Sequence, residues 1–182
     1  AKTGGKVSVE VYPSGQLGGQ RALAESAKLG HIEVGCVSDA ALSGFVSKAM
    51  VFSMPYFFED TFDPYRLLSS PWGKELNQES IKSANLRILT VGGFGFRNLS
   101  NNKKPIRSPA DAAGLKIRVM ERPVPVAMIK GLGANPTPIS ITELYTSLQQ
   151  GVIDGQENPP IVLTTYKLHE VQKYMTLNRH QL

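Results

Sequence analysis

One basic side chain lies inside an apolar strand pattern in the segment Pro109–Arg122, PADAAGLKIRVMER. Apolar and basic residues alternate over Leu115–Val119, so we expect a short strand that packs one face and directs Lys116 and Arg118 to the other. An arginine in that position typically binds an anion, because its planar fork can donate two parallel charge-assisted hydrogen bonds to a carboxylate. Taken alone, the segment favours the plainer interpretation that Arg118 extends from a strand edge into water.

Two further segments shift the balance toward anion binding. Arg97 follows the glycine-rich bend Gly92–Gly95, and Asn158 follows the short apolar segment Val152–Asp154. We expect both residues at strand ends, where ligands commonly bind in α/β proteins. Two guanidinium groups and an amide donor predict a carboxylate site, and they supply no group that would do chemistry. The pattern therefore indicates binding rather than turnover.

Other kinds of site have weak support. The chain has three histidines, His31, His169 and His180. They are far apart, and no acid or histidine recurs at helical spacing to complete a metal-binding pair. Cys36 is the single cysteine, and no GxSxG motif is present. Carboxylates such as Asp154 and Glu157 are expected to be solvated or to cap the backbone. We predict no catalytic residue, no metal ligand and no cofactor.

The composition indicates a soluble globular protein, with 41% hydrophobic residues, 17 glycines and 12 prolines in 182 residues. Apolar runs end well short of the roughly 20 residues that a membrane span needs, so no transmembrane helix is predicted. No signal peptide is visible, and a chain from which one had been removed would look the same. The net charge of +5 is spread along the chain, which argues against nucleic-acid binding and weakly favours anionic partners.

Capping residues and helical spacing predict most of the helices. Helices are expected over Gly19–Leu29, from Asp63 through Leu68, from Pro71 to Asn85, from Pro123 to Gly131, and from about Pro160 to His169. The segment Ser140–Glu143 matches a capping box and predicts a helix that ends at Gly151. Ser38 and Ser108 are each expected to cap a short helical turn.

Strands are predicted between these helices. They are expected at Lys6–Tyr12, Ile32–Val37, Leu86–Val91, Phe96–Ser100, Leu115–Val119, Val152–Asp154 and Lys173–Leu177. The alternation of strands and helices predicts an α/β protein with a largely parallel sheet in each part. The bend Gly92–Gly95 is the predicted boundary, so we expect one domain over residues 1–95 and a second over residues 96–182.

Five segments together resemble one protein family: GKVSVEVYPSGQLGG, GLKIRV, GANPTP, SLQQGVIDGQENPP and HEVQKYMTLNRH. Over nearly its whole length the chain resembles the solute-binding component of tripartite ATP-independent periplasmic (TRAP) transporters. The most specific piece is DGQENP at Asp154–Pro159, followed downstream by EVQKY at Glu170–Tyr174. The resemblance implies a two-domain α/β periplasmic binding protein fold, type II-like, with a hinge and mostly parallel sheets flanked by helices.

The resemblance also implies roles for particular residues. Arg118 would form the salt bridge to the ligand carboxylate, and Arg97 and Asn158 would donate hydrogen bonds to the same group. Glu121 and Ser38 fall where other members contact the remainder of the ligand. That part of the site varies with the substrate.

The chain departs from the family in two respects. Ile141 occupies a position where an aromatic residue lining the pocket is expected, so no aromatic stacking contact is predicted there. The chain also begins later and ends earlier than full members do. Its first domain is therefore incomplete relative to the family, and it resembles a fragment or a chain that lacks its ends.

The implied function is capture of a small-molecule carboxylate by hinge closure in the periplasm, followed by delivery to the TRAP permease subunits in the membrane. Glu121 and Ser38 suit the hydroxyl groups of sugar acids such as uronates. A C4-dicarboxylate is the next candidate ligand, and it would require a second cation in the site. Two alternatives stay open: an enzyme that acts on an anionic substrate with Glu121 or Asp154 as base, and an extracytoplasmic sensor domain of the same fold.

Overall fold

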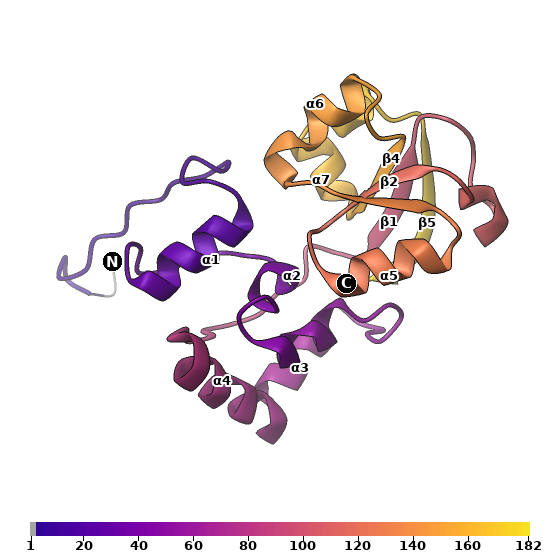
Figure 1. Ribbon diagram of the computed structural model, residues 1–182. Coiled ribbons are helices and arrows are strands. Elements are labelled where there is room, and N and C mark those ends of the chain that lie inside the picture. The colour runs from indigo at the N-terminus through magenta and orange to yellow at the C-terminus, as the bar shows by residue number, and fades with distance from the viewer. Residues whose placement is uncertain (1–2) are drawn as a thin grey trace.

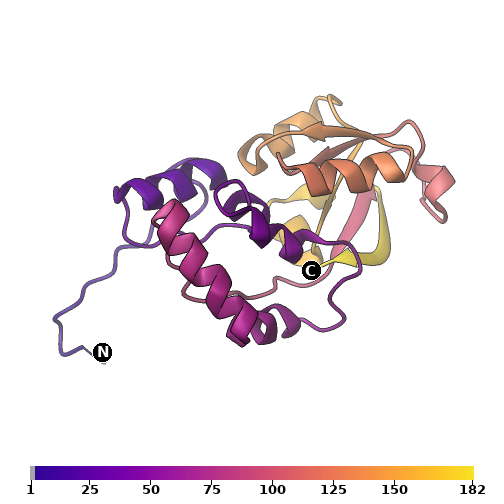
Figure 2. The same cartoon turned by 60° about the horizontal axis from the view of Figure 1, so that its bottom comes forward.

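The computed structural model describes residues 3–182 and divides by secondary structure into two parts. Residues 3–96, the helical part, contain helices and extended segments, and residues 97–182, the sheet part, contain a five-stranded sheet with helices around it (Figure 1). The C-terminal end of the chain lies between the two parts, as the turned view in Figure 2 shows.

The sheet has the strand order β3-β2-β4-β1-β5. Its strands are β1 (Arg97–Asn101), β2 (Lys116–Val119), β3 (Asn135–Pro138), β4 (Gly155–Asn158) and β5 (Tyr174–Gln181). Strand β2 runs parallel to β3 and β4, whereas β1 runs antiparallel to β4 and β5. The prediction of a largely parallel sheet therefore holds for one side of the sheet only. Helical crossovers, which impose parallel pairing, connect β2 to β3 and β3 to β4, but β1 lies between two strands that run against it.

Helices cover both faces of the sheet (Figure 1). Helix α5 (Pro123–Gly131) covers one face, and α6 (Leu144–Gln149) and α7 (Pro160–Thr165) cover the other. The core against α5 includes Leu99, Ile117, Val119 and Ile129. The core against α6 and α7 includes Leu144, Leu148, Ile153 and Leu163. Short 3-10 turns at Pro109–Ala112, Ile141–Glu143 and Leu168–Glu170 connect these elements.

The helical part has a core of its own. Its elements are α1 (Gln20–Leu29), α2 (Asp39–Leu42), the 3-10 helix η1 (Ser47–Ser53), α3 (Asp63–Ser69) and α4 (Pro71–Ala84). The buried cluster consists of Val46, Ala49, Phe52, Phe58, Leu76 and Ala84, and Leu182 packs against it. Three predicted boundaries are confirmed: Gly30 ends α1 at φ 75°, the Ser38 hydroxyl accepts a hydrogen bond from the Ala41 amide at 3.2 Å, and Asn85 ends α4 at φ 55°.

Three predicted strands of the helical part are wrong. Lys6–Tyr12, Ile32–Val37 and Leu86–Val91 are extended or irregular but make no ladder. Val7, Val9 and Val11 are 63%, 79% and 74% exposed. Alternation predicts a face, but a strand also needs a hydrogen-bonded partner, and within residues 3–96 no segment pairs with these three.

Two further predictions need correction in the sheet part. Val152–Asp154 is a turn, and the strand is the following polar segment Gly155–Asn158. The helix predicted from the Ser140 capping box is split into the 3-10 turn Ile141–Glu143 and α6, because the Ser140 hydroxyl bonds to Thr142 Oγ1 at 3.0 Å instead of capping the first turn. The remaining predicted helices and the strands around Arg97, Arg118 and the C-terminus are confirmed within a few residues.

Candidate ligand-binding site

The central strand β4 is polar and fully buried, which is unusual because buried polar groups must find partners. Its neighbours carry the two predicted arginines: Arg118 of β2 pairs in register with Gln156, and β1 pairs Leu99 with Glu157. Successive side chains alternate between faces, so Gln156 and Asn158 share one face of the sheet with Arg118, and Glu157 points to the other. The sheet therefore divides the predicted anion-binding residues between its two faces.

Arg97 is held by Glu157. Its Nε donates to Glu157 Oε2, and its Nη2 donates to Oε1 at 2.9 Å and to the main-chain carbonyl of Glu157 at 2.5 Å. His180 Nε2 lies 3.3 Å from the same carboxylate, which is 0% exposed. Although burial opposes its ionisation, the Arg97 guanidinium and the His180 ring hold the pKa of Glu157 at about 2. The expectation that Glu157 is solvated or caps the backbone is thus wrong.

Arg118 has no such partner. Its side chain is buried, with the residue only 4% exposed, and its Nε donates to the Ile139 carbonyl at 2.7 Å. Among residues 3–182 no carboxylate forms an ion pair with it. Burial lowers the pKa of Arg118 to about 10, with Glu157 opposing that shift and the positive charge of Arg97 adding to it. The interpretation that Arg118 extends into water is wrong, and the structure instead presents a buried cation that lacks a counterion.

Asn158 belongs to a chain of hydrogen bonds on the Arg118 side of β4. Its Nδ2 donates to Gln156 Oε1 at 2.5 Å, and Gln156 Nε2 donates to the Ser100 hydroxyl at 2.7 Å. The Ser100 hydroxyl in turn donates to Gln172 Oε1 at 2.9 Å. Each member fixes the orientation of the next, so the Asn158 amide is held in place beside Arg118.

The two remaining predicted residues come from opposite parts of the molecule. Ser38 caps α2 in the helical part and is half-buried, and its main-chain N–H donates to Gln20 Oε1 at 2.9 Å. Glu121 is exposed on the loop between β2 and α5, and its charge acts on Arg118, whose pKa it helps to keep up. Glu121 thus lies near Arg118, whereas Ser38 belongs to the facing helical part.

Asp39 also belongs to this region, although no pattern in the sequence predicts it. Asp39 accepts a hydrogen bond from the Ser53 hydroxyl, and Gln181 Nε2 lies 3.5 Å from its Oδ2. Burial raises the pKa of Asp39, and the nearby Arg97 opposes that shift. His180 was likewise not predicted as a partner of Glu157. Glu157 lies in DGQENP and His180 ends the family segment HEVQKYMTLNRH, but nothing in either segment indicates that the two side chains meet, and Asp39 lies in none of the quoted segments.

Residues 3–182 contain no group of three or more His, Cys, Asp or Glu side chains that could hold a metal ion. In the same range no helix combines the length and apolarity that a membrane crossing requires. Two shallow surface depressions, one lined by Tyr145, Thr165, Tyr166, Lys167 and Glu170 and one by Thr61, Phe62, Tyr65, Val91, Gly92 and Gly93, contain none of the predicted ligand residues.

Comparison with known proteins identifies the class to which this fold and site belong. The whole chain, residues 1–182, matches the family model DctP, described as bacterial extracellular solute-binding protein, family 7. The chain belongs to this family of periplasmic solute-binding proteins of TRAP transporters, which confirms the resemblance seen in its motifs.

Individual relatives in this family match nearly all of this chain but only about half of their own length. A solute-binding protein of Verminephrobacter eiseniae is 36% identical over 98% of this chain and 53% of its own length. The sialic acid-binding periplasmic protein of Vibrio cholerae is 32% identical over 97% of this chain and 54% of its own length. The chain therefore spans about half the length of the curated relatives that it matches.

Solved structures match the fold closely. A TRAP periplasmic solute-binding protein of Sulfitobacter sp. NAS-14.1 with bound β-D-galacturonate has a TM-score of 0.93 and 33% identity, covering 99% of this chain and 60% of its own. A second, of Sulfurospirillum deleyianum with bound succinate, has a TM-score of 0.92 and 38% identity, covering 99% of this chain and 58% of its own. These matches confirm the predicted α/β periplasmic binding protein fold class.

Proposed function

We propose that this protein is an extracytoplasmic solute-binding protein that captures an organic acid in the periplasm and delivers it to the membrane permease of a TRAP transporter. The observation that carries the proposal is Arg118, a buried guanidinium without a carboxylate partner among residues 3–182. A ligand carboxylate would supply the missing counterion and accept two parallel hydrogen bonds from the fork. The names of the relatives, which bind uronates, succinate and sialic acid, support the same class of ligand.

The other predicted site residues are proposed to contact the ligand as well. Asn158 lies on the Arg118 side of β4 and would donate to the same carboxylate. Arg97 would contribute only through Nη1, because its Nε and Nη2 are bonded to Glu157. Ser38 and Glu121 would contact the rest of the ligand from opposite sides, so that binding draws the two parts together.

We place the hinge between the two proposed domains at the glycine-rich bend that precedes β1. We divide the chain into domains at residues 1–95 and 96–182, since the sheet begins at Arg97 and Gly95 just before it has φ 105°. Glycine adopts a positive φ without the steric cost that other residues meet, so Gly95 suits a bend between the two domains.

Sugar acids are the proposed ligand class, with C4-dicarboxylates second. A dicarboxylate would want a second free cation near Arg118. Of its neighbours in the described structure, Arg97 is paired with Glu157 and Arg122 donates to two main-chain carbonyls, of Ala40 and Glu121. Hydroxyl groups, by contrast, can be served by Ser38 and Glu121.

We further propose binding without turnover, because the family and the structural relatives are substrate-binding proteins of transporters. Incubation of the protein with each acid that binds, followed by NMR of the small molecule, tests this point. An unchanged spectrum is expected, and a new product would favour the enzyme alternative.

A thermal-shift screen of the full protein tests the main proposal. The panel contains uronates, aldonates, C4-dicarboxylates, 2-oxoacids and sialic acid. A ligand at a hundredfold excess over its dissociation constant stabilises the native state by about 2.7 kcal/mol, which is readily measured. We expect a shift with a sugar acid in the native protein and none in Arg118→Ala. No shift with any acid would overturn the proposal.

A further inference from the structure

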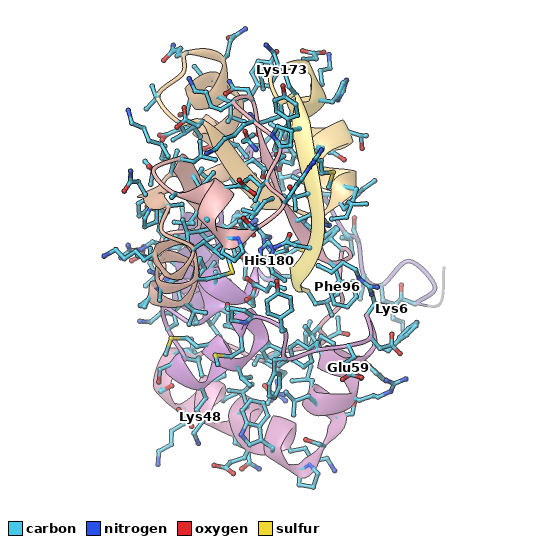
Figure 3. All side chains as sticks on the ribbon, turned by 90° about the vertical axis from the view of Figure 1, so that its right-hand side faces the viewer. Lys6, Lys48, Glu59, Phe96, Lys173 and His180 are labelled. Atoms are coloured by element: carbon cyan, nitrogen blue, oxygen red, sulfur yellow. The ribbon has the colours of Figure 1, made fainter. Side chains whose placement is uncertain are left out.

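The helical part and the sheet part are joined by polar contacts that do not involve the proposed ligand. On the β5 side, the Tyr56 amide donates to the His180 carbonyl at 2.7 Å. Figure 3 shows His180 and Phe96 at the end of β5 that meets the helical part. On the β2 side, Arg122 Nε donates to the Ala40 carbonyl at 2.9 Å. The second contact spans the region between Ser38 and Glu121, whereas the first lies beside the proposed hinge.

The guanidinium of Arg122 packs against α2 and against Gly44, which follows it. Besides the bond to Ala40, its Nη1 donates to the Glu121 carbonyl at 3.0 Å. A Cβ atom added at Gly44 would lie 2.0 Å from Nη2, so an alanine there would force the guanidinium to move from its present position. Gly44 has no positive φ, so its backbone does not require glycine, and an alanine there would act through the space that Arg122 fills.

The backbone of Arg122 is also held in place. The residue is the N-cap of α5, its amide donates to the Met120 carbonyl at 2.7 Å, and Pro123 follows as the first helical residue. Proline in that position restricts the backbone, so the point from which the Arg122 side chain extends is fixed. The loop between β2 and α5 therefore presents Arg122 from a fixed backbone position, and its side chain reaches across to the helical part.

We propose that Arg122, seated over Gly44, is a positioning residue for ligand binding that clamps α2 against the loop following β2. The inference rests on the proposed function and adds a role for a residue that would not touch the ligand. Arg122 joins the same two segments from which Ser38 and Glu121 would contact the ligand. The clamp therefore sets the distance between those two contacts and favours the closed arrangement.

The consequence for affinity follows from the equilibrium between open and closed forms. Apparent affinity falls in proportion to the fraction of protein that is competent to bind. If loss of the clamp lowers the closed fraction about tenfold, the dissociation constant rises about tenfold, and the preference among ligands is unchanged, because Arg122 does not contact them.

Calorimetry on matched variants of the full protein tests the binding effect, with the sugar acid that gives the largest thermal shift as the probe. Arg122→Ala is expected to weaken binding about tenfold, and Arg107→Ala, which removes an exposed arginine of the same part, to leave it unchanged. Gly44→Ala places a methyl group in the guanidinium seat and is expected to reproduce the loss with Arg122 intact. The double variant is expected to lose no more than either single one, because both remove the same contact.

A distance measurement separates a clamp from a merely structural role. Cysteines introduced at the exposed Lys74 and Lys104, in a Cys36→Ser background, place one fluorophore on each part. Without ligand, Arg122→Ala and Gly44→Ala are expected to lower the transfer efficiency, and saturating ligand to restore it. Arg118→Ala is expected to keep the native efficiency while losing binding.

The outcomes distinguish the two proposals. Native affinity and native transfer efficiency in both Arg122→Ala and Gly44→Ala would overturn the clamp and leave the proposed function standing. Retention of native affinity by Arg118→Ala, or failure of the unaltered protein to bind any acid, would instead overturn the proposed function.

Discussion

Arg97 and Arg118 lie on the two strands that flank β4, and both are largely shielded from water, with the Arg97 side chain 11% exposed and Arg118 4% exposed, yet their surroundings differ in kind. Arg97 has an internal counterion in Glu157, which His180 also contacts. Arg118 has a single bond to a main-chain carbonyl and no carboxylate partner among residues 3–182. A buried charge that is paired with an internal carboxylate holds the fold together. A buried charge that lacks one is poised to take a partner from outside.

The contrast carries opposite expectations for substitution. Removing one member of the Arg97–Glu157 pair leaves the other as an unpaired buried charge and destabilises the fold. Removing Arg118 takes away a charge that is already unpaired, so it costs binding and spares stability. Ligand-site residues often show this exchange of stability for function.

The largest expected effect is on ligand affinity in Arg118→Ala. Loss of one partner from a buried ion pair costs about 3 to 5 kcal/mol, which corresponds to at least a hundredfold rise in the dissociation constant. The free energy of unfolding without ligand should be unchanged or higher. Calorimetry and urea denaturation measure the two quantities, and a variant that unfolds more easily yet still binds would reverse the assignment of the two arginines.

The next effect is on stability in Glu157→Gln. The amide cannot neutralise Arg97, so the free energy of unfolding should fall by about 3 kcal/mol. Urea denaturation with Glu33→Gln as a matched control, where an exposed carboxylate is changed, checks the value. Equal stability of the two variants would show that the Arg97–Glu157 pair does not hold the sheet together.

The pH dependence of the free energy of unfolding also tests whether the ionised Glu157 stabilises the fold. The folded pKa of Glu157 is about 2 and the ordinary value is 4.5, so its contribution is full above about pH 4.5 and is lost as the pH falls toward 2. Asp39 acts with the opposite sign, because burial raises its pKa and its ionisation opposes folding at higher pH. Acid denaturation should therefore flatten between pH 4.5 and 2 in Glu157→Gln. A curve of unchanged slope there would assign the acid sensitivity to other groups.

The smallest expected effects are at the residues proposed to contact the rest of the ligand. Ser38→Ala and Glu121→Gln should each weaken binding roughly five- to tenfold, since each removes one hydrogen bond of about 1 kcal/mol or more. They should also change the order of preference among sugar acids. Ser38→Ala also removes a helix cap worth about 1 kcal/mol, so Ser70→Ala, which removes the cap of α4, is the matched control for stability. An unchanged ligand order in both site variants would remove Ser38 and Glu121 from the site.

Some helix ends and the Arg118 strand were predictable from the sequence, because each depends on local chemistry, whereas the Ser140 capping box was not borne out. Ser38 and Asn85 set helix ends through bonds to their own neighbours in the chain. Arg118 was marked by its alternation with Ile117 and Val119, whose side chains are in the core against α5. The family motifs then added a role for it that the pattern alone did not favour.

What escaped prediction depends on partners distant in the chain. The segment Gly155–Asn158 has the composition of a loop and becomes a buried strand only because Arg97 and His180 satisfy Glu157, and Ser100 satisfies Gln156. Val7–Val11 shows the reverse case, in which a strand pattern stays exposed because no strand pairs with it in the described part of the chain. Neither outcome is encoded in the periodicity of the segment itself.

Calorimetric titration with one sugar acid and with its uncharged parent sugar tests the central claim most directly, because the two ligands differ only in the group that Arg118 is proposed to bind. With D-galacturonate and D-galactose as the first pair, or the best acid from the thermal-shift panel and its parent sugar, we predict saturable binding of the acid alone, and no binding of either ligand by Arg118→Ala. Equal affinity for the acid and the neutral sugar, or native affinity for the acid in Arg118→Ala, would contradict it.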